Sequence, residues 1–82
     1  MIDKNLLTAI LTLPSNGETL LLESLMIVKN YTDIQLLSND EGRVYYKAKI
    51  DDLLSSDITE DEVKKLNESG WKIEDDYIVK DL

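Results

Sequence analysis

The chain has 82 residues and no cysteine, and it carries a net charge of −8. Apolar residues make up 43% of it and charged residues 32%, so we expect one globular domain spanning residues 1–82 rather than a disordered chain. The missing cysteines exclude a small secreted domain stapled by disulfides. The first residues resemble no signal peptide, and no apolar run is long enough to span a bilayer. The sequence therefore predicts a cytoplasmic protein without membrane contact.

The charge is unevenly distributed along the chain. Residues 1–50 hold six acids and five bases, whereas residues 51–82 hold eleven acids and four bases, a net charge of −7. Because this acidic part repels phosphates, direct binding of nucleic acid is not expected. The acidic region either keeps the protein soluble or presents a surface to a basic partner.

The N-terminal third favours two helices. Asp3 is placed to cap the first helix, and Ser15–Glu18 has the spacing of a capping box for a second helix that ends near Asn30. The apolar stripe of the first helix is formed by Leu6, Leu7, Ile10 and Leu11. The alternative is that residues 5–30 form two strands around Pro14–Gly17, but leucine-rich runs favour helix.

A β-hairpin is expected next, with arms Ile34–Ser38 and Arg43–Ile50 around a turn at Asn39–Gly42. Alternation in the second arm predicts one buried face and one solvated face. The buried face consists of Val44, Tyr46, Ala48 and Ile50, and the solvated face of Tyr45, Lys47 and Lys49. Asp51–Ser56 can add a further helical turn.

The clearest helix begins after Thr59. Thr59–Glu62 is a capping box, and Gly70 supplies the left-handed residue that ends the helix. The run Trp71–Lys80 then predicts a second hairpin that turns at Asp75–Asp76. The expected fold is a small α+β domain, an antiparallel sheet of two β-hairpins with about three helices in the order α-α-β-β-α-β-β.

The helix and hairpin of Thr59–Lys80 resemble the recognition helix and wing of winged-helix domains over about a quarter of the chain. This helix, however, opens with three acids, Glu60, Asp61 and Glu62, which oppose contact with DNA. The resemblance implies a transcription-associated protein that binds protein rather than reads DNA.

The second helix is apolar almost all round, with only a narrow polar stripe. Its apolar residues are Leu20, Leu21, Leu22, Leu25, Met26, Ile27, Val28 and Tyr31. This helix is either the central core helix or, in part, an interface for a second copy or another protein. A homodimer is one such arrangement.

The residues offer little chemistry. The chain lacks histidine and cysteine, its three glycines are far apart, and its acidic clusters lack the spacing of a calcium loop. We therefore expect no enzyme, no catalytic residues, no cofactor and no metal.

These observations predict a non-enzymatic protein-interaction module. It would be a small acidic regulator or inhibitor, of the kind that phages and mobile elements encode as accessory proteins, acting on a basic partner surface. The alternatives are a winged-helix-like transcription-associated protein and a self-assembling structural protein. The candidate partner-binding residues are Ile27, Tyr31, Tyr45, Lys47, Glu60, Asp61, Asp75 and Asp76.

Overall fold

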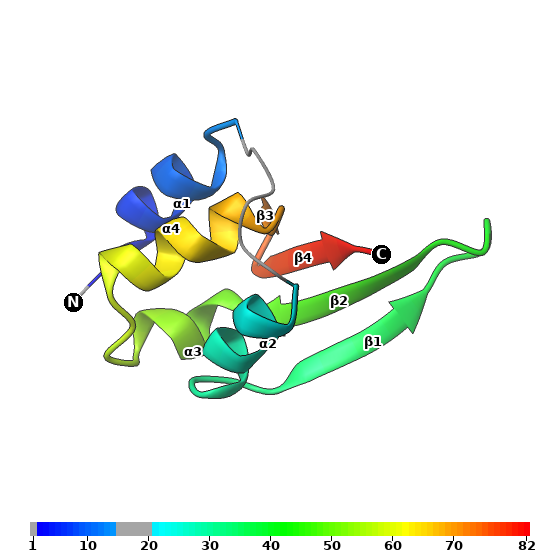
Figure 1. The fold of residues 1–82 in the computed structure, drawn as a ribbon, viewed down its shortest axis with the longest axis horizontal. Helices are drawn as coiled ribbons and strands as arrows, with labels where there is room; N and C mark the ends of the chain where they lie inside the picture. The colour runs from blue at the N-terminus through cyan, green and yellow to red at the C-terminus, as the bar shows by residue number, and fades with distance from the viewer. Residues whose placement is uncertain (1, 15–20) are drawn as a thin grey trace.

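The computed structural model describes residues 2–14 and 21–82, in which four helices lie over one face of a four-stranded antiparallel sheet (Figure 1). The helices are α1 (Lys4–Leu11), α2 (Leu21–Lys29), α3 (Ile50–Leu54) and α4 (Glu60–Glu68). The strands are β1 (Ile34–Ser38), β2 (Val44–Lys49), β3 (Lys72–Glu74) and β4 (Tyr77–Asp81). The predicted α+β class and the two hairpins are confirmed, and the extra helical turn forms as α3.

The two hairpins join into one sheet with the strand order β1-β2-β4-β3. The junction is the antiparallel pair of β2 and β4, in which Tyr46 lies opposite Lys80 and Ala48 opposite Ile78. The hairpin that follows α4 is therefore a component of the sheet and does not stand free as a wing. The order of helix and hairpin on which the resemblance to winged-helix domains rests is present as α4, β3 and β4.

The N-terminal third is helical in its described parts, as predicted. The Asp3 carboxylate accepts a hydrogen bond from the backbone N–H of Leu6 at 2.8 Å and begins α1. Leu7, Ile10 and Leu11 are buried, while Leu6 lies at the edge of the stripe and is partly exposed. The capping box predicted at residues 15–18 lies outside the described residues.

Helix α4 begins at the predicted capping box. The Thr59 hydroxyl accepts from the N–H of Glu62 at 3.2 Å, and the Glu62 carboxylate accepts from the N–H of Thr59 at 3.0 Å. Two of the N–H groups that a helix leaves unpaired at its start are thereby satisfied.

The turn that ends α4 places Trp71 in the core. Gly70 takes a φ of 96°, in the left-handed region. The N–H of Trp71 then reaches back to the carbonyl of Leu66, and that of Gly70 to the carbonyl of Asn67, both at 3.0 Å. This pair of bonds is a Schellman motif, in which the residue after the glycine packs against the last turn of the helix.

Trp71 is the one aromatic residue among the fully buried core residues of the described chain. Its indole Nε1–H donates to the hydroxyl of Ser24 at 2.9 Å, and this hydroxyl donates to the carbonyl of Leu21 at 2.8 Å. Ser24 is also fully buried. The bond connects α2 to the segment between α4 and β3. Both buried polar groups, the indole N–H and the serine hydroxyl, thereby have a hydrogen-bond partner.

The outer half of the β1–β2 hairpin extends past the helices (Figure 1). Ala48 and Ile50 are buried as the alternation predicts, but Tyr46 is half-buried and Val44 is exposed. The prediction of a continuous buried face was wrong for Val44, because none of the described helices covers that end of the hairpin. Ile50 begins α3 and does not extend the strand.

We expect Ser24→Ala to destabilise the protein by about 1–3 kcal/mol, because it leaves the buried indole N–H of Trp71 without an acceptor. Urea unfolding followed by tryptophan fluorescence measures the change. The matched control is Ser55→Ala, an exposed serine whose hydroxyl bonds to a carbonyl of its own helix, and its effect should stay within about 0.5 kcal/mol. Equal losses for the two variants would contradict a structural role of the indole bond.

Candidate functional site

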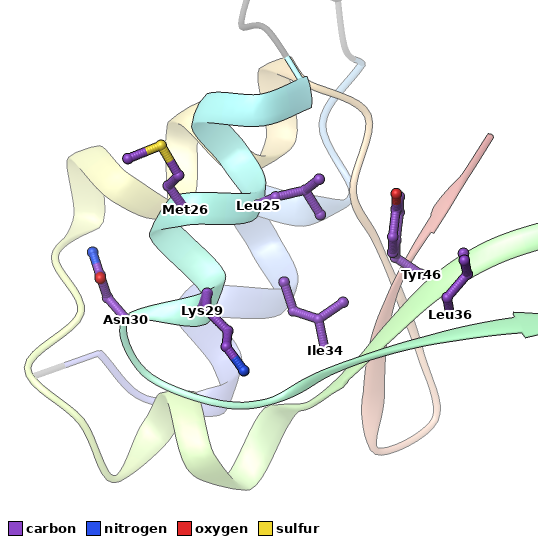
Figure 2. A pocket seen from close by; sticks show the side chains of 7 residues that line it. All are labelled: Leu25, Met26, Lys29, Asn30, Ile34, Leu36 and Tyr46. Carbon is purple, nitrogen blue, oxygen red and sulfur yellow. The ribbon is translucent and has the colours of Figure 1, made fainter.

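An open groove of about 440 Å³ lies between α2 and the β1–β2 hairpin. Figure 2 shows Leu25 projecting from α2 toward Tyr46 on β2, with Ile34 rising from the start of β1 between them. The groove exists because the hairpin runs on beyond the helices, so one side of α2 faces an uncovered stretch of sheet. Its lining residues are Leu25, Met26, Lys29, Asn30, Ile34, Leu36 and Tyr46.

Two large apolar side chains that line this groove, Met26 and Leu36, are exposed to solvent, and Leu22 is exposed one helical turn before Met26. Leu22 is 68% exposed, Met26 61% and Leu36 60%. Leu22 and Met26 are four residues apart and share one face of α2, while Leu36 reaches the groove from β1. Contiguous apolar surface of this kind is uncommon on soluble monomers and usually marks an interaction site.

The charge within the groove is low. Among the described residues that line it, Lys29 alone is charged, and its ammonium forms an exposed ion pair with Asp33 at 3.1 Å. The net charge of −7 carried by residues 51–82 therefore lies outside the groove lining. The arrangement is an apolar centre within an acidic molecule, and such a centre suits a protein contact more than a charged ligand.

The two predicted contact residues on and after α2, Ile27 and Tyr31, differ in how far they are buried. Ile27 is 9% exposed and belongs to the core, so the exposed apolar side chains of the helix are those of Leu22 and Met26. Tyr31, just after the helix, is half-buried, and its hydroxyl donates to the Glu62 carboxylate at 2.7 Å. Tyr31 thus links the end of α2 to the capping box of α4.

The hydrogen bond between Tyr31 and Glu62 shifts the pKa of both side chains. Partial burial on its own would raise the pKa of Glu62, but the hydrogen bonds from Tyr31 and Thr59 outweigh it and lower that pKa below its ordinary value. The pKa of Tyr31 is raised, first by its hydrogen bond to the Glu62 carboxylate and then by burial. The carboxylate is therefore held in its charged form, and the phenol in its neutral form.

Tyr45 and Lys47 lie on the face of the sheet that points away from the helices. The Lys47 ammonium sits 3.9 Å from the centre of the Tyr77 ring, a cation–π contact across β2 and β4. Arg43, at the end of the same hairpin, pairs with Asp81. The basic groups of Lys47 and Arg43 are therefore both engaged with neighbouring side chains.

The four predicted acidic contacts occupy two separate elements. Glu60 and Asp61 are exposed in the first turn of α4, where Glu60 pairs with Lys64 at 3.6 Å. Asp75 and Asp76 form the β3–β4 turn, in which Asp75 has a φ of 54°. The Asp76 carboxylate oxygen Oδ1 lies 3.9 Å from the ammonium nitrogen of Lys4. Only the first pair lies near α2, since Glu62 of the same turn contacts Tyr31.

Sequence reasoning identified α2 as the element to examine but missed the wall opposite it. Leu36 and Tyr46 follow an ordinary strand pattern, which does not show how far a hairpin extends beyond the helices that cover it. The signal that was available is the apolar circumference of α2, which includes both Leu22 and Met26.

No protein family, curated protein or solved structure matched the chain. Among residues 2–14 and 21–82, no helix is long and apolar enough to cross a membrane. In the same residues, no group of three or more acidic side chains is placed to hold a metal ion. The groove beside α2 is therefore the feature of the molecule from which a function can be inferred.

The lowered pKa of Glu62 has a consequence for acid stability. Its contribution is present in full above the ordinary glutamate pKa of about 4.3 and is lost as the pH falls through the lower pKa of the folded state. We expect the free energy of unfolding of the wild type to fall more steeply below this pH than that of Glu62→Gln. Urea unfolding at pH values from 7 down to 3 measures both curves.

The control for this measurement is Asp61→Asn, which changes an exposed carboxylate in the same helical turn. Its pH dependence should stay closer to that of the wild type. An acid dependence that Glu62→Gln leaves unchanged would contradict the assigned role of the Tyr31–Glu62 bond.

Proposed function

We propose that the chain is a non-enzymatic protein-interaction module, a small acidic regulator or inhibitor that acts by binding another protein at the groove beside α2. The observation that carries the proposal is the exposed apolar lining of this groove, above all Met26 and Leu36, which expose more than half of their surface to solvent. The sequence is consistent with a role by binding, because a chain without histidine and cysteine lacks the usual general base and thiol nucleophile.

Covering the groove is energetically favourable. Burial of apolar surface contributes roughly 25 cal/mol per Å², and a fully covered leucine or methionine contributes about 1.5–3 kcal/mol. Met26 on α2 and Leu36 on β1 supply exposed apolar surface of the kind found at the centre of protein interfaces, while the surrounding polar groups supply the rim.

The acids near α2 favour a basic partner. Glu60 and Asp61 are exposed in the turn of α4 that contacts Tyr31 through Glu62. Glu23 on α2 pairs with Lys65 of α4 at 3.2 Å, so the two helices lie side by side. Exposed negative charge of this kind accelerates the approach of a positively charged surface, and the apolar groove then provides the lasting contact.

The test is a pull-down from the lysate of the native host with tagged wild type and variants, read by mass spectrometry. We expect Met26→Lys to reduce capture of the partner at least tenfold at both low and high salt, because it places a charge in the apolar centre. The double variant Glu60→Lys, Asp61→Lys should reduce capture mainly at low salt, where exposed charges are least screened.

The matched control is Leu13→Lys, since Leu13 is 58% exposed and lies outside the groove lining. Its capture should equal that of the wild type. A partner bound equally well by Met26→Lys would remove the groove as the binding surface, and a lysate that yields no stoichiometric partner would contradict the proposed function.

A further inference from the structure

The two edges of the sheet differ in how they are protected. The β3 edge is three residues long, carries the exposed charges of Lys72 and Glu74, and packs beside α1. The β1 edge, Ile34–Ser38, is five residues long and contains no charge and no proline. Because proteins usually shield long edge strands with charge, proline or a covering element, the uncharged β1 edge is an opening for another strand.

The backbone of β1 is oriented for such pairing. In an antiparallel ladder, alternate residues direct their N–H and C=O groups to opposite sides. The backbone N–H and C=O groups of Val44 point toward β4, since its carbonyl accepts a hydrogen bond from the N–H of Leu82 at 3.1 Å. Ser38 lies opposite Val44. Its backbone N–H and C=O groups therefore point away from β2, toward the open edge of the sheet. By alternation, Leu36 and Ile34 face the open side as well.

We infer that β1 pairs in antiparallel fashion with β1 of a second copy of this chain, about a twofold axis at Leu36. This inference rests on the proposed function, because it takes the groove beside α2 to be a protein-binding surface. Leu36 then pairs with its own symmetry mate, and Ile34 of each copy lies opposite Ser38 of the other. The two four-stranded sheets join into one continuous sheet with both helical layers on the same side.

The twofold arrangement also covers the exposed apolar side chains. The helices of each copy lie toward the Ile34 end of β1, whereas the hairpin end extends beyond them (Figure 1). Antiparallel pairing therefore sets the uncovered hairpin end of one copy alongside α2 of the other. Leu36, 60% exposed in the single chain, lies at the centre of this contact in both copies.

Charge complementarity favours a second copy over an unrelated strand. Lys29 lies in the last turn of α2, near the Ile34 end of β1, where its ammonium forms an exposed ion pair with Asp33 that pairing with a second copy would extend to a further acid. The turn after β1 carries the exposed acids Asp40 and Glu41. Antiparallel pairing brings this acidic turn of one copy to the Lys29 end of the other, twice by symmetry. Residues 51–82, which carry a net charge of −7, contribute no residue to β1 or to the groove lining.

The first measurement is the molar mass by light scattering behind a sizing column over a range of concentrations. We expect the mass to rise with concentration from 9.4 kDa toward twice that value. Leu36→Lys should weaken self-association at least tenfold, and Leu13→Lys should not. Lys29→Glu should weaken it too, and adding Glu41→Lys to that variant should restore it. Circular dichroism checks that each variant is folded.

The second measurement uses the absence of native cysteine. The symmetric pair at Leu36 has an expected Cα–Cα distance of about 5.5 Å, within the range of a disulfide. Leu36→Cys should therefore form a covalent dimer under mild oxidation much faster than Leu13→Cys, whose residue is equally exposed.

A chain that stays monomeric at every concentration, or a dimer that Leu36→Lys leaves intact, overturns the inference. A monomer that still captures a lysate protein in a Met26-dependent manner overturns the dimer alone and leaves the proposed function standing. A Leu36-dependent dimer that captures no other protein supports the inference and contradicts the proposed regulator.

Discussion

The hydrogen bond between the Trp71 indole and the Ser24 hydroxyl is the constraint on which the rest of the structure depends. The Schellman motif at Gly70 ends α4 and turns Trp71 inward, where the side chain meets the buried serine of α2. Since a thin core of aliphatic side chains offers little directional information, this buried polar contact is a directional restraint on how α2 lies against α4 and the β3–β4 hairpin. The side of α2 that faces the β1–β2 hairpin, and hence the groove, follows from that placement.

A second link acts at the other end of α2. Tyr31 donates to Glu62, which also completes the capping box with Thr59, so one carboxylate joins the end of α2 to the beginning of α4. Thr32, one residue further on, donates to Asp52 of α3 at 2.7 Å. With both ends held, α2 presents Leu22 and Met26 to solvent as fixed features of the surface, and a preformed apolar surface costs less entropy to bind than a mobile one.

Local chemistry made much of the fold predictable. The Thr59–Glu62 box, Gly70 and the Asp75–Asp76 turn each act within a few residues, and the elements they imply are present. The pairing of β2 with β4 was not predictable, because it joins segments about thirty residues apart without a local signal. For the site, the apolar circumference of α2 indicated the right helix. Because the polar stripe of this helix is narrow, the sequence pattern did not show that Ile27 is buried and Met26 exposed.

The overhang of the β1–β2 hairpin sets a gradient of local stability along these two strands. Near Ala48 the ladder rests on the buried core, whereas near Val44 it has solvent on both sides. Backbone amides close to the Asn39–Arg43 turn should therefore exchange with solvent through openings that leave the Trp71 core intact, and protection should rise steadily toward α3. The hairpin can open from its tip while the helical layer stays folded, so its outer half can adapt to a bound strand without disturbing the remainder of the molecule.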